Sequence, residues 1–292
     1  MKSFRHLFLA VAKRIGIARL IPDKMYLKLL YRDIIGKKLN LKNPVTYGEK
    51  LQWLKLYDRN PLYHMLVDKY EVKNYIKEKI GSQYVVPLYG VWNTPGDIDF
   101  SSLPDSFVLK STHDSGGYFI CKNKEELDEM LVREKYKKLL SRDYYLPGRE
   151  WVYKGVKPRV IAEKYLGNED EKSIDDYKVM CFEGIPKLIE VHQGRFENHT
   201  QDFYDAQWNK TEISQGTKTN LEVLERPAFL DEMLEKSSYL AKGIHHVRVD
   251  WYYSQGQLYF GELTFFDDSG FSLFEPEQYN KIIGDWIEID RK

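Results

Sequence analysis

The sequence predicts an α+β fold in which a mainly helical segment precedes a region rich in strands. Residues 1–80 place apolar side chains at helical spacing. From about residue 85 onward, short apolar strands alternate with helices, and several connecting turns are too short to contain a crossover helix. Strand pairing is therefore expected to be largely antiparallel. The 292 residues suffice for one large domain or two small ones.

Four helices are expected before residue 80. The first is basic and amphipathic, and the others cover 24–35, 47–57 and 61–80. The apolar residues of the first helix that follow helical spacing are Phe4, Leu7, Phe8, Val11 and Ile15.

Two interpretations of this first helix stay open. Residues 1–38 carry ten Lys or Arg against two Asp, a local excess of +8. The helix either docks on anionic lipid or packs its apolar face on the protein. Its apolar run is too short to span a bilayer and no small-residue cleavage site follows, so neither a transmembrane segment nor a signal peptide is expected. The expected location is cytoplasmic, at the inner face of the membrane if the helix binds lipid.

The remaining elements follow in order along the chain. Strands are expected at 85–92, 106–110, 118–123 and 159–167, helices at 124–140 and 221–243, and hairpins at 176–192 and 247–265. The first hairpin should turn at Glu183-Gly184, and residues 271–289 are helical or irregular.

Composition excludes several classes of protein. Lys+Arg and Asp+Glu both number 44, so a net charge of zero gives no support to a nucleic-acid partner. The only cysteines, Cys121 and Cys181, lie far apart, which indicates a reducing compartment rather than a disulfide scaffold. They also lack metal-ligand spacing.

The most informative stretch is the hairpin at 247–265, VRVDWYYSQGQLYFGELTF. Because strand side chains alternate between faces, Arg248 and Asp250 share one face, and Glu262 and Thr264 share a face on the return strand. If the loop around 254–257 has an odd number of residues, positions 250 and 262 stand opposite each other. Two such carboxylates suit Mg²⁺ carrying a nucleotide triphosphate. A structural network between Arg248 and these carboxylates is the alternative interpretation.

Two other segments contain the residue types of a nucleotide site. Lys110 ends a strand and precedes STHDSGG, whose small residues let backbone N–H groups approach a phosphate. In IAEKYLG, the chain leaves a strand after Glu163, and an extended backbone there can pair with a flat purine. Taken singly, these segments are more typical of an ordinary hairpin loop and a charged edge strand.

Together, these pieces occur in the order and approximate spacing of the ATP-grasp fold. The chain most resembles the TupA-like ATP-grasp proteins of bacterial surface-polysaccharide clusters, over roughly residues 40–290. The stretches that carry this resemblance are YGEKLQWLKLYDRNP (47–61), LPDSFVLKSTHDSGG (103–117), DYKVMCFEGIPK (176–187), RFENHTQDFYD (195–205) and RVDWYYSQGQLYFGELTF (248–265). The resemblance implies a basic helical region at 1–85 and an ATP-grasp domain at 86–292. Its two subdomains, at about 105–165 and 166–292, would clamp ATP.

The resemblance also implies a role for each matching position. The phosphates would be held by Lys69 (or Lys73, in the same expected helix) and Lys110, under a loop of Ser115, Gly116 and Gly117. The adenine would contact Glu163, Lys164, Tyr165 and Leu166. The magnesium would be bound by Asp250 and Glu262, and the reacting groups would face Lys178 and Arg248. Many ATP-grasp enzymes have Asn where this chain has Thr264, a weaker ligand that Asp267 or Asp268 could supplement.

The implied reaction joins a carboxylate to an amine. The carboxylate attacks the γ-phosphoryl group of ATP to give an acyl phosphate, which the amine then attacks. The expected partners are an acidic sugar or acidic peptide of a surface polymer and an amine donor, and the cofactors are ATP and Mg²⁺. Arg195 and His199 either contact this substrate or tie down their loop, and His113 is more typical of loop structure than of a general base.

Two alternatives remain. A phosphotransferase or glycosyltransferase of the same pathway would use the carboxylates at 250 and 262 for a metal-bound nucleotide. A non-catalytic ATP-binding scaffold would keep the fold without turnover, and Thr264 is the residue that favours it. Release of ADP that requires both an acid and an amine would favour the ligase.

Overall fold

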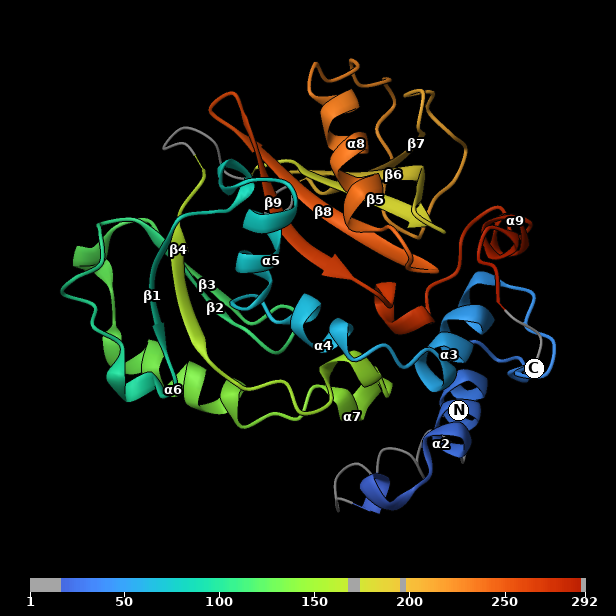
Figure 1. The fold of residues 1–292 in the computed structure, drawn as a ribbon, viewed down its shortest axis with the longest axis horizontal. Coiled ribbons are helices and arrows are strands. Elements are labelled where there is room, and N and C mark those ends of the chain that lie inside the picture. The colour runs from blue at the N-terminus through green and yellow to red at the C-terminus, as the bar shows by residue number, and fades with distance from the viewer. Residues whose placement is uncertain (1–16, 168–173, 195–197, 290–292) are drawn as a thin grey trace.

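The computed structural model describes residues 17–167, 174–194 and 198–289, which form two antiparallel sheets and the helices that cover them. In Figure 1 the smaller sheet lies to one side and the larger sheet to the other, with α4 (Leu62–Val67) and α5 (Val72–Lys79) between them. This confirms the α+β fold with antiparallel pairing.

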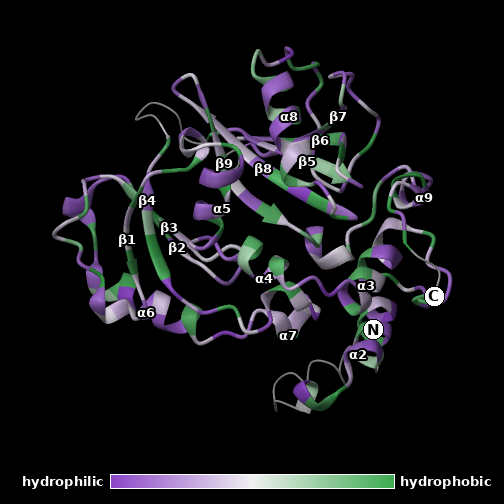
Figure 2. Ribbon diagram, viewed as in Figure 1, coloured by the Kyte–Doolittle hydropathy of each residue, from purple (hydrophilic) through white to green (hydrophobic). Residues whose placement is uncertain are grey.

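The smaller sheet has the strand order β1-β4-β2-β3. Its strands are β1 (Leu88–Trp92), β2 (Phe107–Ser111), β3 (Tyr118–Cys121) and β4 (Val160–Lys164). Helix α6 (Glu129–Leu140) begins at Asp128, whose side chain accepts a hydrogen bond from the Leu131 N–H, and buries Val132 and Tyr136 against this sheet. The first residues of β4, an inner strand, are hydrophobic in Figure 2. The predicted 159–167 strand is therefore a core strand and not an edge.

The larger sheet has the strand order β7-β6-β5-β8-β9. Its strands are β5 (Asp176–Phe182), β6 (Ile185–Gln193), β7 (Thr200–Asp205), β8 (His246–Ser254) and β9 (Gln257–Thr264). Helix α8 (Leu230–Leu240) packs on one face, where Trp251 Nε1 donates to Ser237 Oγ at 2.8 Å. The opposite face carries the polar residues of the site.

The N-terminal helices share the core of the larger sheet. Helix α3 (Tyr47–Tyr57) has the predicted bounds and begins with a capping box between Thr46 and Glu49. Its buried Leu51 and Leu54 belong to the same apolar cluster as strands β5 to β9. Helix α2 (Asp23–Ile34) and the C-terminal α9 (Tyr279–Asp285) lie nearby in Figure 1, and α7 (Tyr145–Gly148) precedes β4 in the chain.

Short 3-10 helices complete the described elements. They are η1 (Ile17–Leu20), η2 (Ser82–Tyr84), η3 (Pro95–Asp97), η4 (Lys124–Glu126), η5 (Trp151–Tyr153) and η6 (Asp267–Gly270). The predicted helix at 124–140 is therefore η4 followed by α6.

Local structure differs from the sequence prediction in three places. The expected helix at 61–80 is broken into α4 and α5, because Asp68 has an extended backbone and its carboxylate accepts a hydrogen bond from the Tyr70 N–H at 2.9 Å in the turn between the two helices. The expected helix at 221–243 shortens to α8, which begins only after Pro227. Residues 200–205, for which no element was predicted, form the edge strand β7.

Two one-residue bulges set the register of the larger sheet. Both hairpins turn through two residues, Glu183-Gly184 and Gln255-Gly256, all with left-handed φ angles. The second loop therefore has an even count, contrary to the condition on which the sequence prediction depended. A bulge at Gly261 adds one residue to β9 and restores Asp250 opposite Glu262. A second bulge, on β6 opposite Met180 and Cys181, likewise sets Lys178 opposite Glu190.

The predicted first helix, with Phe4 to Ile15, lies outside the described residues, so both interpretations of it remain predictions. Within residues 17–167, 174–194 and 198–289, no helix is long and apolar enough to cross a membrane. Cys121 and Cys181 are both buried and free.

Replacing Gly261 by Ala should destabilise the fold, because the added Cβ would lie 3.0 Å from the Asp250 carbonyl oxygen at the bulge. We expect Gly261→Ala to lower the unfolding free energy by about 1–3 kcal/mol in urea denaturation. Gly96→Ala is the control, since the nearest atom to its added Cβ is 3.8 Å away. Equal stabilities of the two variants would show that the bulge tolerates a side chain.

Candidate active site

A row of charged residues crosses the larger sheet on one face. The two bulges bring Glu190 on β6, Lys178 on β5, Asp250 on β8 and Glu262 on β9 into register. The row faces a cleft with a volume of ≈480 Å³, to which the smaller sheet contributes Lys110 and the loop Ser115–Gly117. The alternation of side chains in β strands puts all of these groups on one surface.

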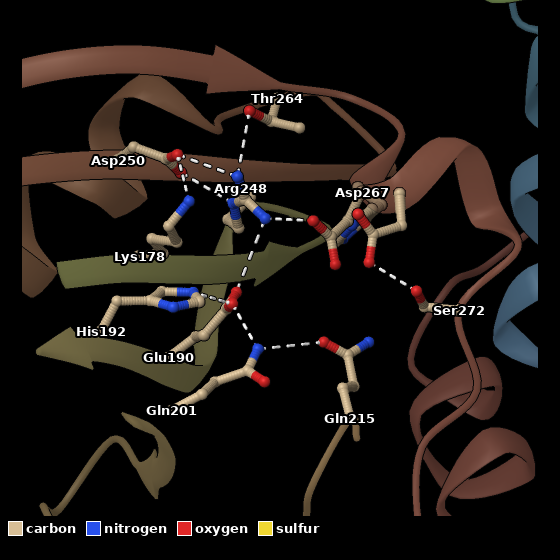
Figure 3. A network of polar contacts seen from close by, with 12 residues as sticks. Lys178, Glu190, His192, Gln201, Gln215, Arg248, Asp250, Thr264, Asp267 and Ser272 are labelled. Atoms are coloured by element: carbon tan, nitrogen blue, oxygen red, sulfur yellow. Dashed lines mark hydrogen bonds and ion pairs between the residues drawn. The ribbon is translucent and has the colours of Figure 1, made fainter. Parts of the chain in front are cut away.

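Arg248 is the centre of this surface. It is 6% exposed and binds Asp250 with two parallel hydrogen bonds, Nε to Oδ1 at 2.8 Å and Nη2 to Oδ2 at 2.9 Å. Nη1 donates to Asp267, and Lys178 Nζ donates to Asp250 Oδ2 at 3.1 Å (Figure 3). Burial alone would lower the pKa of Arg248, but the surrounding carboxylates Asp250, Asp267 and Glu190 raise it well above its usual value.

Glu262 faces Lys69, which lies in the break between α4 and α5. Lys69 Nζ lies 3.4 Å from Glu262 Oε2 and also donates to the Asp114 carbonyl. Burial would raise the pKa of Glu262, but Lys69, Lys178 and Arg248 lower it to about 2. Lys69 therefore connects the loop at 111–117, which is expected to bind phosphate, to the carboxylate expected to bind metal. It does so from the turn between α4 and α5 and not from a helix, which corrects the sequence prediction.

Glu163 is buried between two lysines. Its carboxylate lies 2.5 Å from Lys73 Nζ and 2.7 Å from Lys110 Nζ. Burial would raise the pKa of Glu163, but Lys110 and Lys73 lower it to about 2. Lys110 lines the cleft, whereas Glu163 does not. In this structure the Glu163 carboxylate therefore neutralises the charges of Lys73 and Lys110. Its predicted contact with adenine stays a prediction.

The loop at 111–117, which is expected to bind phosphate, is anchored by more hydrogen bonds than its sequence indicates. Ser111 donates to Asp114, the Lys69 backbone N–H donates to the Thr112 carbonyl at 3.1 Å, and His113 Nε2 lies 3.2 Å from the Arg142 carbonyl. A Cβ on Gly117 would lie 1.8 Å from Ser111 Oγ, so only glycine fits there. Ser115 and Gly116 are the exposed tip of the loop. His113 is thus a structural residue of the loop.

The segment expected to hold adenine lies at the junction of the two sheets. Lys164 ends β4 and its N–H donates to the Pro87 carbonyl at 2.9 Å. The Leu166 carbonyl accepts from Ser254 Oγ at 2.6 Å, and Tyr165 faces Lys122. Among the described residues, the cleft wall is formed by other side chains, so this segment borders the cleft without lining it.

The η6 loop, which carries Asp267, is fixed by helix α3. Gln52 Nε2 donates to the Ser269 carbonyl at 2.9 Å, and Lys55 Nζ donates to the same carbonyl at 2.7 Å and to Gly148 at 2.8 Å. Asp268 and Ser269 both have left-handed backbone, a conformation that needs such support. Burial lowers the pKa of Lys55 to about 7, although Glu150 opposes the shift. The helical region before the sheets therefore positions a partner of Arg248.

Sequence reasoning missed one end of the site. Glu190, His192, Gln201 and Gln215 line the cleft beyond Lys178. The alternation of LIEVH puts Glu190 and His192 on one face, but only the bulge, which the sequence does not reveal, makes that face the one with Lys178. His199 lies behind His192, with Nε2 2.7 Å from His192 Nδ1, and Arg195 lies outside the described residues.

The oxygen donors fit a magnesium ion that is shared with phosphates. Asp250, Glu262 and Thr264 all line the cleft, and oxygen is the ligand that Mg²⁺ prefers. Across the described residues, no group of three or more His, Cys, Asp or Glu side chains could hold a metal by itself. Mg²⁺ commonly uses one or two carboxylates together with phosphate oxygens and water, so two carboxylates and a hydroxyl are sufficient.

Two sheets that face a common cleft, one with a small-residue loop after a lysine and the other with paired carboxylates, define an ATP-grasp protein. The family model described as TupA-like ATPgrasp matches residues 49–288, and the chain belongs to this family.

Comparison with solved structures adds distant likenesses. A D-alanine–D-alanine ligase from Bacillus anthracis complexed with ATP is 20% identical, with 68% of this chain and 55% of that chain covered and a TM-score of 0.43. An L-amino acid ligase from Bacillus licheniformis is 16% identical over 76% and 49%, with a TM-score of 0.46. The ATP-grasp ligase PsnB, complexed with a precursor variant, Mg and ADP, is 12% identical over 75% and 56%, with a TM-score of 0.39. The chain thus spans about half the length of these structures, and a search of curated proteins found no match.

The Glu163 pair predicts a stability that depends on acid pH. The pKa of about 2 lies below the ordinary glutamate pKa of 4.5, so the folded carboxylate binds fewer protons than the unfolded one. Its stabilisation is therefore lost as pH falls from about 4.5 towards 2. We expect Glu163→Gln to be less stable than wild type at pH 7, by on the order of 3 kcal/mol. The difference should narrow when urea unfolding is repeated at pH 4 and pH 3. A difference that stays constant with pH would show that Glu163 is not ion-paired.

Proposed function

We propose that this protein is an ATP-dependent ligase that joins a carboxylate to an amine through an acyl phosphate, with Mg²⁺ as cofactor. The observation that carries the proposal is the arrangement of the cleft. Lys69 and Lys110 face the row of Lys178, Asp250 and Glu262 across one cavity. Membership of the TupA-like ATP-grasp family supports the same reaction class.

Each step has matching side chains. Lys69, Lys110 and the backbone of Ser115–Gly117 bind the phosphates of ATP. Asp250 and Glu262 would hold Mg²⁺, with Thr264 as a further oxygen, and the ion supplies charge neutralisation at the phosphates. The substrate carboxylate attacks the γ-phosphorus, the bond from that phosphorus to the β-γ bridging oxygen breaks, and ADP leaves.

The second step transfers the acyl group. The amine nitrogen attacks the acyl carbon, the bond from that carbon to the phosphate oxygen breaks, and phosphate and a proton are released. Lys178 contacts Asp250 with one of its three N–H donors, so it can bind the reacting carboxylate or the oxyanion with the others. Besides its hydrogen bond to a carboxylate, each terminal nitrogen of Arg248 has one longer contact, Nη1 to Glu190 and Nη2 to Thr264, both at 3.5 Å. The N–H groups that make these two longer contacts are available to the same oxyanion.

We further propose that the substrates are an acidic sugar or acidic peptide of a bacterial surface polysaccharide and an amine donor. Family membership supports this assignment. An ADP-release screen over pairs of uronic acids or acidic peptides with amines, followed by mass spectrometry of the product, tests it. ADP release that needs both partners supports the ligase. A phosphorylated acid as the final product would instead indicate a phosphotransferase, and ATP binding without turnover a scaffold.

In this assay, Glu262→Gln should abolish turnover while the protein stays folded. The substitution keeps the shape of the side chain but removes its charge, and we expect ADP release to fall by about 100-fold or more. Glu235→Gln is the matched control, since this carboxylate is exposed on α8. Turnover by Glu262→Gln close to that of the control would remove Glu262 from the metal site.

The proposed location is cytoplasmic, in contact with the inner face of the membrane through the basic N-terminal segment. The local excess of +8 in residues 1–38 supports this location. We expect the full chain to co-sediment with vesicles that contain anionic lipid and not with neutral vesicles, and removal of residues 1–16 to abolish the difference. Equal sedimentation with both vesicle types would favour internal packing of the helix.

A further inference from the structure

A second set of polar side chains lies at the end of the row away from Lys69 and Glu262. Strands β6 and β7 carry Glu190, His192 and Gln201, and Gln215 follows β7 in the chain (Figure 3). All four line the same cleft as the loop residues Ser115–Gly117. The reaction proposed above gives none of them a role.

Glu190 is held as a carboxylate anion. It is 3% exposed, and its Oε1 accepts hydrogen bonds from His192 Nε2 and from Gln201 Nε2, the latter at 2.6 Å. Burial alone would raise its pKa, but Arg248, His192 and Lys178 hold the pKa well below the usual range. The side chain is therefore charged and fixed in one orientation.

Two buried polar atoms at this end have no hydrogen-bond partner among the described residues, Glu190 Oε2 and Gln215 Nε2. The charged group nearest to Glu190 Oε2 is Arg248 Nη1 at 3.5 Å, which makes an ion pair without a hydrogen bond. Gln215 directs its oxygen towards Gln201, at 3.4 Å, which leaves its Nε2 unpaired (Figure 3). Because buried polar groups are normally paired, an acceptor and a donor left open in a cleft indicate a ligand.

The local charge favours a cationic ligand. Glu190 is the carboxylate of the row that lies farthest from Glu262, where the metal is expected. The only cation near its Oε2 among the described residues is Arg248, whose Nη1 lies 3.5 Å away. The open oxygen of Glu190 is suited to a protonated amine and would repel a carboxylate.

The spacing of the sheet also suits an amine at this position. Neighbouring strands lie about 4.8 Å apart, so the Glu190 backbone is about 10 Å from that of Asp250, with Lys178 between them. A phosphoryl group near Asp250 and Glu262 would leave the space beside Lys178 and Arg248 for the acyl group. The incoming amine would then approach from Glu190.

We propose that Glu190 and Gln215 form the subsite for the amine substrate. Glu190 Oε2 accepts from the ammonium group, and Gln215 Nε2 donates to an oxygen on the neighbouring part of the same molecule. Amino alcohols, amino sugars and amino acids share this chemistry. His192 and Gln201 act as positioning residues that fix the Glu190 carboxylate. The inference rests on the proposed ligase function and specifies the substrate that this function leaves open.

Amine saturation kinetics with the full chain test the subsite. ATP, Mg²⁺ and the acid that gives ADP release are held at saturation, and the amines are ethanolamine, D-glucosamine and glycine, with ethylamine as an amine that lacks the oxygen. We expect Glu190→Gln to raise KM for the three oxygen-bearing amines by about 10- to 100-fold, the effect of losing a hydrogen bond to a charged group. KM for ATP should change far less. Glu235→Gln should change neither.

Gln215→Leu is the second variant, because its Nε2 has no hydrogen bond within the described chain to lose. It should raise KM about 3- to 10-fold for ethanolamine and leave KM for ethylamine unchanged. This variant decides the question if Glu190→Gln fails to fold, as judged by thermal unfolding.

Each failure has a distinct signature. Unchanged amine KM values in the folded variants, or equal increases for amine and ATP, overturn the amine subsite while leaving the ligase intact. If wild type has the same KM for ethylamine as for ethanolamine, Gln215 does not bind the oxygen of the amine substrate. Absence of ADP release from wild type with every acid and amine overturns the ligase function, and the subsite with it.

Discussion

Burial of the Arg248 guanidinium is the constraint on which the rest of the site depends. A charge taken out of water must be matched, and Arg248 is matched by carboxylates from three different elements, β8, η6 and β6. Those contacts fix the orientation of Asp250 and tie the η6 loop to the sheet. They also connect the two ends of the row, because the same guanidinium contacts Asp250 and Glu190. Removal of any one of these carboxylates would therefore change the contacts of Arg248 at both ends of the row.

The cleft is built by elements that are far apart in the chain. The smaller sheet supplies Lys110 and its loop, and the larger sheet supplies the acidic row. The N-terminal helices are not an appendage, since Gln52 and Lys55 of α3 bind the backbone of the η6 loop. The break between α4 and α5 likewise brings Lys69 to the cleft. The helical region before the sheets thus supplies Lys69 to the site and holds the loop that carries Asp267.

Much of the fold and part of the site could be predicted from sequence. Alternation along β8 and β9 correctly grouped Arg248, Asp250, Glu262 and Thr264, because side-chain direction in a strand follows from its period of two. The strand register could not be predicted, because a bulge shifts the pairing by one residue and the sequence does not show where the extra residue lies. Glu190 was missed for this reason. The break at Asp68 was missed because the apolar spacing continues on both sides of it.

The pairing of Lys73 and Lys110 with Glu163 leaves little net charge beside Lys110. An anion that reaches Lys110 can use the N–H donors that do not contact Glu163, but it would share the ammonium charge with that carboxylate, which lies 2.7 Å away. A chloride ion would therefore gain little at Lys110 alone. A polyphosphate could contact Lys110 and Lys69 together, so this pairing would favour multivalent anions over monovalent ones.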